Sequence, residues 1–201
     1  MRQLFTPFSL ILLSYLLVAQ LVKSENPQLY VEKIHDDIIQ VVIEKQSIYE
    51  DRPEEFIKSI AKSLEPLVDF KRISRNVMGK HYKMASQDQR DKFQEIFKST
   101  LLETYSKTLA EFKNEEIRII PSINSSNKPN REKVHLEIVT STKIYPAFYD
   151  MYLNKKNEWK LINIVINGVN LGVTFRNQFY SLMKDQENDI DKVIDLWIAS
   201  F

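Results

Sequence analysis

Residues that could perform catalysis or bind a metal are few in this chain of 201 residues. It contains three histidines, His35, His81 and His135, and no two of them have the three- or four-residue spacing of a metal-binding pair on a helix. It has no cysteine, which excludes disulfides, thiol catalysis and thiolate metal sites. It also lacks a G-x-S-x-G motif and a glycine-rich phosphate loop. We therefore predict no catalytic residue, no metal site and no cofactor.

Two polar positions still allow specific predictions. His35 is followed directly by two aspartates in a predicted helix, so we expect it on a solvent-exposed face. Asp150 is the only acid within the predicted strand 143–153, and its neighbours Tyr149 and Met151 should take the inward face. Asp150 should then point outward, because successive side chains of a strand alternate between faces. An inward Asp150 with a raised pKa would instead favour a small isomerase-like enzyme with a carboxylate base.

The first 24 residues are typical of a secretory signal peptide. Arg2 supplies a positive charge, an almost uncharged apolar run extends from Leu4 to Val22, and the polar sequence SENPQ follows. Cleavage after Ser24 would leave residues 25–201. An uncleaved membrane anchor is the alternative, because the apolar run is nearly long enough to span a bilayer. Export without cysteine is ordinary for a bacterial periplasmic protein and unusual for a small eukaryotic secreted domain.

Composition and charge indicate one ordinary globular domain. The hydrophobic fraction is 43% and the charged fraction 27%, which fits a folded chain. Without residues 1–24 the chain has 26 basic and 27 acidic residues and a formal charge of −1. This charge leaves no basic excess for nucleic acid. No internal repeat or Ser/Gly linker divides residues 25–201, so we predict a single domain there and no nucleic-acid partner.

The hydrophobic periodicity predicts helices, then strands, then helices. A 3.6-residue period runs through the first half, and Ser86 with Gln89 forms a capping box at the start of the clearest helix. After residue 114 the period changes to two. The predicted helices are 27–50, 51–66, 67–80 and 86–113, the strands lie within 115–121, 133–142, 143–153 and 158–166, and two closing helices lie within 169–197. This order predicts an α+β fold with an antiparallel sheet of about four strands.

The last predicted strand, residues 158–166, is apolar on both faces. Leu161 and Val165 alternate with Ile162, Ile164 and Ile166, whereas an antiparallel strand commonly has one solvated face. Three explanations remain open at this point. Helices could cover both faces, another subunit could cover one, or the sheet could curve around a cavity that holds an apolar ligand.

Two blocks of the sequence follow a recognisable pattern. The first block reads P-L-x-D-F, V-L-G-x-x-W/Y, A-S/T-x-x-Q-R-x-x-F-x-x-x-F and L-x-x-x-Y, and its matching residues are Pro66, Leu67, Asp69, Phe70, Val77, Gly79, Tyr82, Ala85, Ser86, Gln89, Arg90, Phe93, Phe97, Leu101 and Tyr105. The second block reads W-K/Q-x-Y-D-x-x-x-E-G-V-S-L with a later Q-F/W pair, and its matching residues are Trp159, Gly168, Val169, Leu171, Gln178 and Phe179. Together they resemble the MlaC family, the periplasmic phospholipid-binding proteins of the Mla lipid-transport pathway, also called toluene-tolerance proteins. The likeness runs from about residue 27 to the end of the chain.

Three asparagines depart from the second block. Asn163 stands where the family has an acid, Asn167 where it has glutamate, and Asn170 where it has serine. Two carboxylates are therefore lost near the end of the strand. If those acids contribute to a partner surface or to local hydrogen bonds, the transfer of lipid could be altered.

The resemblance implies a curved antiparallel sheet wrapped by N-terminal and C-terminal helices, related to cystatin-like and nuclear-transport-factor-like folds, with an apolar cavity for acyl tails. It implies a non-enzymatic, monomeric shuttle in the periplasm of a Gram-negative bacterium. Phospholipid would pass between an outer-membrane lipoprotein–porin complex and an inner-membrane Mla-type ABC transporter with a lipid-binding ring, which maintains outer-membrane lipid asymmetry. A ligand-free periplasmic adaptor and a small isomerase-like enzyme remain the alternatives.

Ten residues are candidates for the wall of the tail cavity. They come from the inward strand faces, the turn into the closing helix and the long helix. Ordinary core packing is the alternative for each of them. The ten are Phe97, Tyr105, Leu136, Ile138, Tyr149, Met151, Leu161, Val165, Val169 and Leu171.

Overall fold

The computed structural model describes residues 26–111, 115–121 and 128–198. The predicted signal peptide, residues 1–24, lies outside them. No helix in the described ranges is both long enough and apolar enough to cross a membrane. The elements, with η for a 3-10 helix, are α2 (Pro27–Lys45), η2 (Gln46–Ile48), α3 (Pro53–Leu64), α4 (Phe70–Met78), η3 (Gly79–Lys83), α5 (Gln87–Ala110), β1 (Glu116–Ile120), β2 (Arg131–Val139), β3 (Ile144–Leu153), β4 (Trp159–Ile166), β5 (Val169–Asn170), α6 (Leu171–Asp185) and α7 (Ile190–Asp195). The predicted α+β order is confirmed.

Local sequence signals set the ends of the helices that flank the site. The side chain of Ser86 accepts a hydrogen bond from the backbone N–H of Gln89, and the side chain of Gln89 accepts one from the backbone N–H of Ser86. This is the predicted capping box of α5. Gly79 ends α4 with a φ of 53°, which glycine adopts at low cost. A β-carbon there would also clash with the hydroxyl of Tyr180, so the position requires glycine for space as well.

The five strands form one antiparallel sheet in the order β1-β2-β3-β4-β5. Four of them correspond to the predicted strands, and β5 adds a two-residue strand that pairs with the end of β4. Asn167 and Gly168 make the turn between β4 and β5 with φ values of 48° and 82°. Asn-Gly is a favoured sequence for such a tight turn, because both of its central residues need a positive φ.

A β-bulge interrupts the pairing of β4 with β3. Met151 pairs with Leu161 and Asp150 pairs with Asn163. Ile162 is therefore an extra residue that has no counterpart in β3. An extra residue of this kind bends the strand and re-aims the side chains that follow it.

The bulge reverses the alternation of side chains in the second half of β4. Tyr149 pairs with Ile164 and Phe148 pairs with Val165. Tyr149 packs into the core on the inner face, so its partner Ile164 also faces inward and Val165 faces outward. The prediction that Val165 lies on the inward face was therefore wrong. It assumed regular alternation along the whole strand, and the bulge at Ile162 interrupts that alternation.

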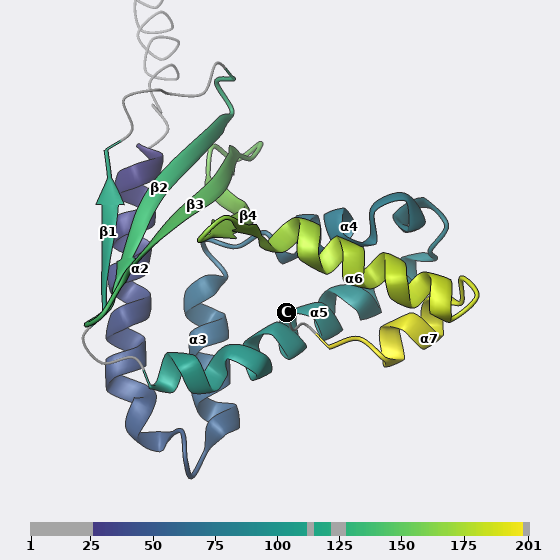
Figure 1. Ribbon diagram of the computed structural model, residues 1–201, viewed down its shortest axis with the longest axis horizontal. Helices are drawn as coiled ribbons and strands as arrows, with labels where there is room; N and C mark the ends of the chain where they lie inside the picture. Colours follow the sequence, from purple (N-terminus) through teal and green to yellow (C-terminus); the bar gives the residue numbers. More distant parts are fainter. Residues whose placement is uncertain (1–25, 112–114, 122–127, 199–201) are drawn as a thin grey trace, which may run out of the picture.

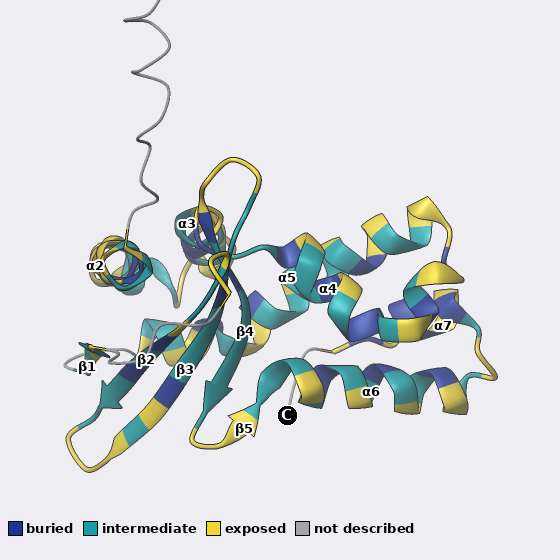
Figure 2. Ribbon diagram, turned by 90° about the horizontal axis from the view of Figure 1, so that it is seen from above, coloured by how far each residue is buried: buried dark blue, intermediate teal, exposed yellow. Residues whose placement is uncertain are grey.

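Helices cover the inner face of the sheet and continue beyond its edge (Figure 1). α2 lies on this face, where Val31 and Ile34 pack against Val134, Leu136 and Met151. A second core joins α2 to α3 and α5. Helices α4, α5, α6 and α7 share a third core and form a separate group beside β4 (Figure 2). The fold thus has a sheet part and a helical part, with β4 and α5 between them.

The first turn of α6 is held by two asparagines. The side chain of Asn170 accepts a hydrogen bond from the backbone N–H of Val173 at 3.1 Å, as a helix N-cap does. The side-chain oxygen of Asn163 accepts another from the backbone N–H of Gly172 at 3.0 Å. Serine, the residue of the family pattern at position 170, is an equally good N-cap, so this replacement conserves the local interaction.

We expect Asn170→Ala to lower the free energy of unfolding by about 1 kcal/mol, because an N–H at the start of α6 loses its acceptor. Asn170→Ser is the matched control and should remain within about 0.5 kcal/mol of the original chain, since its hydroxyl can accept the same bond. Urea unfolding followed by circular dichroism measures both values. Equal losses in the two variants would show that the cap does not account for the effect.

Candidate functional site

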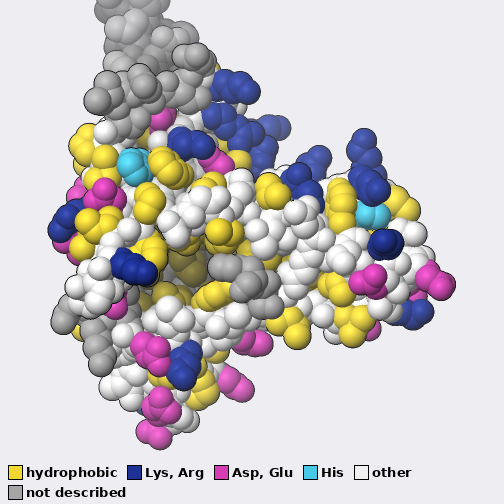
Figure 3. Space-filling model, in the orientation of Figure 1, with side chains coloured by type: hydrophobic (Ala, Val, Ile, Leu, Met, Phe, Trp, Pro, Cys, Tyr) yellow, Lys and Arg dark blue, Asp and Glu magenta, His cyan; other side chains and the backbone are white. Residues whose placement is uncertain are grey.

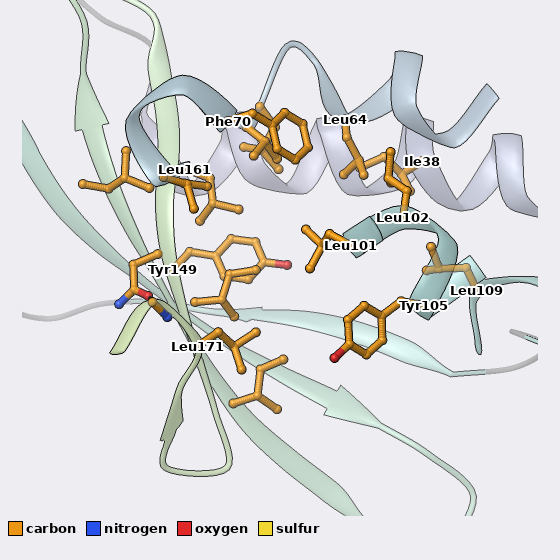
Figure 4. Close-up of a pocket in the computed structure, with 18 of the residues that line it drawn as sticks. Ile38, Leu64, Phe70, Leu101, Leu102, Tyr105, Leu109, Tyr149, Leu161 and Leu171 are labelled. Atoms are coloured by element: carbon orange, nitrogen blue, oxygen red, sulfur yellow. The ribbon is translucent and has the colours of Figure 1, made fainter. Parts of the chain in front are cut away.

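An apolar cavity of about 380 Å³ lies where the sheet meets α2, α3, α4, α5 and the start of α6 (Figure 4). This volume is at the lower end of the range of ligand pockets, about 300–1,000 Å³. In the space-filling view, hydrophobic side chains line a hollow between the sheet part and the helical part (Figure 3). Lysine and arginine side chains gather along one edge of the same view, away from that hollow.

The wall of the cavity is almost entirely hydrocarbon. Four lining side chains carry a polar atom, namely those of His35, Tyr105, Tyr149 and Asn163. Apart from Gly172, the other lining residues are apolar: Ile38, Ile39, Leu64, Leu67, Val68, Phe70, Ile73, Phe97, Leu101, Leu102, Leu109, Ile117, Leu161, Ile162, Ile164, Ile166, Leu171 and Phe175. Among the described residues, no charged side chain belongs to this wall. Such a space suits an apolar ligand, because an ionised group placed there would lose its hydration.

Five of the ten candidate residues line the cavity. Phe97 and Tyr105 reach it from α5, Tyr149 from β3, Leu161 from β4 and Leu171 from the first turn of α6. Tyr105 and Tyr149 both point their hydroxyl groups toward the open space (Figure 4). The structure thus brings together residues from four separate elements.

The other five candidates lie elsewhere. Leu136, Ile138 and Met151 belong to the core between the sheet and α2, farther along the inner face. Val165 faces outward beside Phe148, and Val169 on β5 is 46% exposed. Alternation along a strand predicts which face a residue takes. It does not predict which part of that face a helix covers.

His35 is the main lining residue that the sequence reading placed wrongly. It is buried, with 7% of its surface exposed, whereas a solvated position was predicted. The two adjacent aspartates favoured that prediction. The spacing of His35 with Ile38 and Val42 was the signal for the other answer, because residues three and seven positions apart share a helix face. The lining residues between the end of α3 and α4 show no comparable spacing in the sequence that would have predicted their place in the wall.

His35 and Tyr149 form a neutral polar pair within the apolar wall. Nε2 of His35 lies 3.1 Å from the hydroxyl oxygen of Tyr149, and the two rings meet edge to face with centroids 5.4 Å apart. Burial lowers the pKa of His35 to about 4, although the negative charge of Asp36 opposes this shift. Burial also raises the pKa of Tyr149 to about 12. Both side chains are therefore uncharged at neutral pH.

Asp150 does not join this pair. Its carboxylate accepts a hydrogen bond from Nδ2 of Asn163 at 2.8 Å and lies 3.5 Å from Nζ of Lys133. Asp150 is on the opposite face from Tyr149 and Met151, as predicted, and is not part of the cavity wall. In the described ranges, no group of three or more histidine, aspartate or glutamate side chains is placed to hold a metal ion. The geometry therefore does not offer the inward carboxylate that the isomerase-like alternative requires.

A curved antiparallel sheet and a surround of helices that enclose an apolar cavity define a class of cavity-forming α+β proteins. The family model described as "MlaC protein" matches residues 32–199, and the chain belongs to the MlaC family. It is 34% identical over 151 residues, or 74% of the chain and 69% of the relative, to the toluene tolerance protein ttg2D of Pseudomonas putida. It is 23% identical over 176 residues, or 85% of the chain and 81% of the relative, to the intermembrane phospholipid transport system binding protein MlaC of Haemophilus influenzae.

A solved structure shares the fold. The phospholipid-binding protein from Ralstonia solanacearum, determined in complex with a phospholipid, superposes with a TM-score of 0.75. The match covers 85% of this chain and 98% of that protein at 21% sequence identity. At this identity the likeness establishes the fold, while the family assignment rests on the sequence matches.

Protonation of His35 should make stability depend on pH in a defined window. Its pKa is about 4 in the folded chain and about 6.5 when unfolded, so the unfolded state binds the proton more readily between these values. We expect the free energy of unfolding to fall by about 3 kcal/mol as the pH decreases from about 7 to about 4, and to gain nothing from this group above pH 7.

The variant His35→Gln should remove most of this pH dependence, because glutamine does not titrate and can still donate to Tyr149. A weaker slope should remain, since burial also lowers the pKa of His81. His135→Gln changes a histidine outside the cavity wall and is the matched control. Urea unfolding at a series of pH values is the measurement, and a slope in His35→Gln equal to that of the original chain would contradict the assignment.

Proposed function

We propose that this chain is a periplasmic phospholipid carrier that holds acyl tails in the cavity and leaves the head group in water. The observation that carries the proposal is the apolar, uncharged wall of about 380 Å³ in a member of the MlaC family. The names of two relatives, one a phospholipid transport binding protein, support the same ligand class. The phospholipid in the Ralstonia solanacearum structure of the same fold adds further support.

The energetics of tail burial explain why a carrier needs a cavity of this kind. Each methylene removed from water is worth about 0.8 kcal/mol, so long acyl chains cannot leave a membrane without an apolar receptor. The membrane offers the same gain, and a carrier must therefore match it without greatly exceeding it. A wall that is mostly hydrocarbon, with a few uncharged polar groups, meets this condition, because it adds few interactions that would prevent release.

The proposal includes the location and partners implied by family membership. The chain would be exported by residues 1–24 and act as a monomer in the periplasm of a Gram-negative bacterium. It would exchange phospholipid between an outer-membrane lipoprotein–porin complex and an inner-membrane Mla-type ABC transporter with its lipid-binding ring. These partners are supported by the family and by the relative named as part of an intermembrane phospholipid transport system.

The direct test is native mass spectrometry of residues 25–201 purified without detergent, with lipid extraction from the same sample. A phospholipid adduct near one per chain is expected. A chain that is free of lipid and takes none up from liposomes would overturn the proposal. A ligand-free adaptor would then be the better reading.

A pair of neighbouring substitutions tests whether the cavity is the lipid site. Ile164→Trp adds bulk on the inward face of β4 and should lower lipid loading about tenfold, or by about 1.4 kcal/mol, because the new ring takes space that an acyl tail would occupy. Val165→Trp adds slightly more bulk, but on the outward face, and should leave loading within about twofold of the original chain, a difference that corresponds to less than 1 kcal/mol. Loading from fluorescent phospholipid vesicles measures both. Equal loading of the two variants would place the lipid elsewhere.

A further inference from the structure

The hydroxyl group of Tyr149 in the cavity wall has a hydrogen-bonding capacity that its partner in the fold does not exhaust. Both polar atoms of the Asn163 side chain already have a partner in the fold, since Nδ2 donates to Asp150 and the oxygen accepts from Gly172. The hydroxyl of Tyr149 differs, because within the described ranges its one hydrogen-bond partner is Nε2 of His35 at 3.1 Å. A phenol can donate one hydrogen bond and accept others, so a single partner leaves capacity for a ligand.

The surroundings of His35 indicate which atom donates within the pair. Its Nδ1 is buried and has no hydrogen-bond partner in the part of the chain that the structure describes. A neutral imidazole carries one N–H and one bare nitrogen, and a buried N–H without an acceptor is rarer than an unpaired acceptor. The proton is therefore placed on Nε2, which donates to the oxygen of Tyr149.

This arrangement leaves the Tyr149 proton available to the cavity. The hydroxyl already accepts from His35, so its own O–H needs an acceptor that the fold does not supply. Figure 4 shows the hydroxyl directed into the open space, toward Leu101. His35 on α2 contacts Tyr149 on β3, and the two rings pack edge to face. This contact fixes the direction of the Tyr149 hydroxyl.

We propose that the Tyr149 hydroxyl, oriented by His35, donates a hydrogen bond to an ester carbonyl of the bound lipid. This inference rests on the proposed function, because it concerns the lipid in the same cavity. An ester carbonyl is an acceptor without a donor, which matches the O–H that Tyr149 presents to the cavity. It is also uncharged, which matches a wall whose described side chains carry no charge, whereas a phosphate would be strongly desolvated there.

The experiment compares two lipids that differ only in this acceptor. The chain is incubated with mixed vesicles that contain equal amounts of dipalmitoyl phosphatidylcholine and its di-O-hexadecyl ether analogue, which has no carbonyl. Native mass spectrometry then gives the ratio of the two bound lipids. We expect the original chain to prefer the ester about fivefold, the value of one neutral hydrogen bond. Tyr149→Phe should bind the two lipids equally.

Tyr145→Phe is the matched control, because Tyr145 lies on the same strand and pairs with Ile138, away from the cavity wall. It should keep the preference for the ester. Equal binding of ester and ether by the original chain would overturn the inference, and so would an unchanged preference in Tyr149→Phe. The first of these results does not depend on the stability of any variant. Uptake of neither lipid would overturn the proposed function, whereas equal uptake of both would overturn the carbonyl contact alone.

Discussion

The extra residue at Ile162 is the constraint on which the cavity wall depends. A regular strand that began with Leu161 inward would also turn Asn163 and Val165 inward, and would expose Ile164 and Ile166 on the other face. The bulge instead keeps Leu161, Ile164 and Ile166 on the inner face. The apolar wall on this side of the cavity is thus a consequence of one irregular pairing, and β-bulges often serve to re-aim side chains in this way.

An empty apolar space weakens a fold, because atoms around it lose packing contacts. The helical part offsets this weakness with a dense aromatic core that lies next to the cavity. The ring of Phe93 lies within 4.9 Å of Phe179 and 5.1 Å of Trp197, centroid to centroid. Phe97 and Phe175 belong both to this core and to the cavity wall. The wall on the side of α5 and α6 is therefore backed by closely packed rings, which allows the space to persist without collapse.

The sequence predicts those parts of the site that depend on local patterns, and it does not predict those that depend on tertiary packing. Periodicity and capping residues are local, so the long helix with Ser86 and Gln89 was predicted to within a few residues. The bulge was missed, because the apolar run through Ile162 has no glycine or other local mark of an irregularity. The prediction for His35 was wrong because it gave more weight to the charged neighbours of this residue than to its helical spacing. Val68 and Phe70 line the cavity through the path of the chain between α3 and α4, and such tertiary placement has no periodic signature.

The asparagine at position 163 shows how the departure from the family pattern is accommodated. Its nitrogen donates to Asp150 on β3 and its oxygen accepts from Gly172 on α6, so one amide links three elements at the cavity wall. An acid at this position could still accept from Gly172, but it would place a second carboxylate beside Asp150. Two adjacent carboxylates disfavour joint ionisation, so one of them would have to hold a proton. The amide supplies both the donor and the acceptor without that electrostatic cost. Loss of the carboxylate therefore preserves the junction of β3, β4 and α6 without placing a second acid beside Asp150.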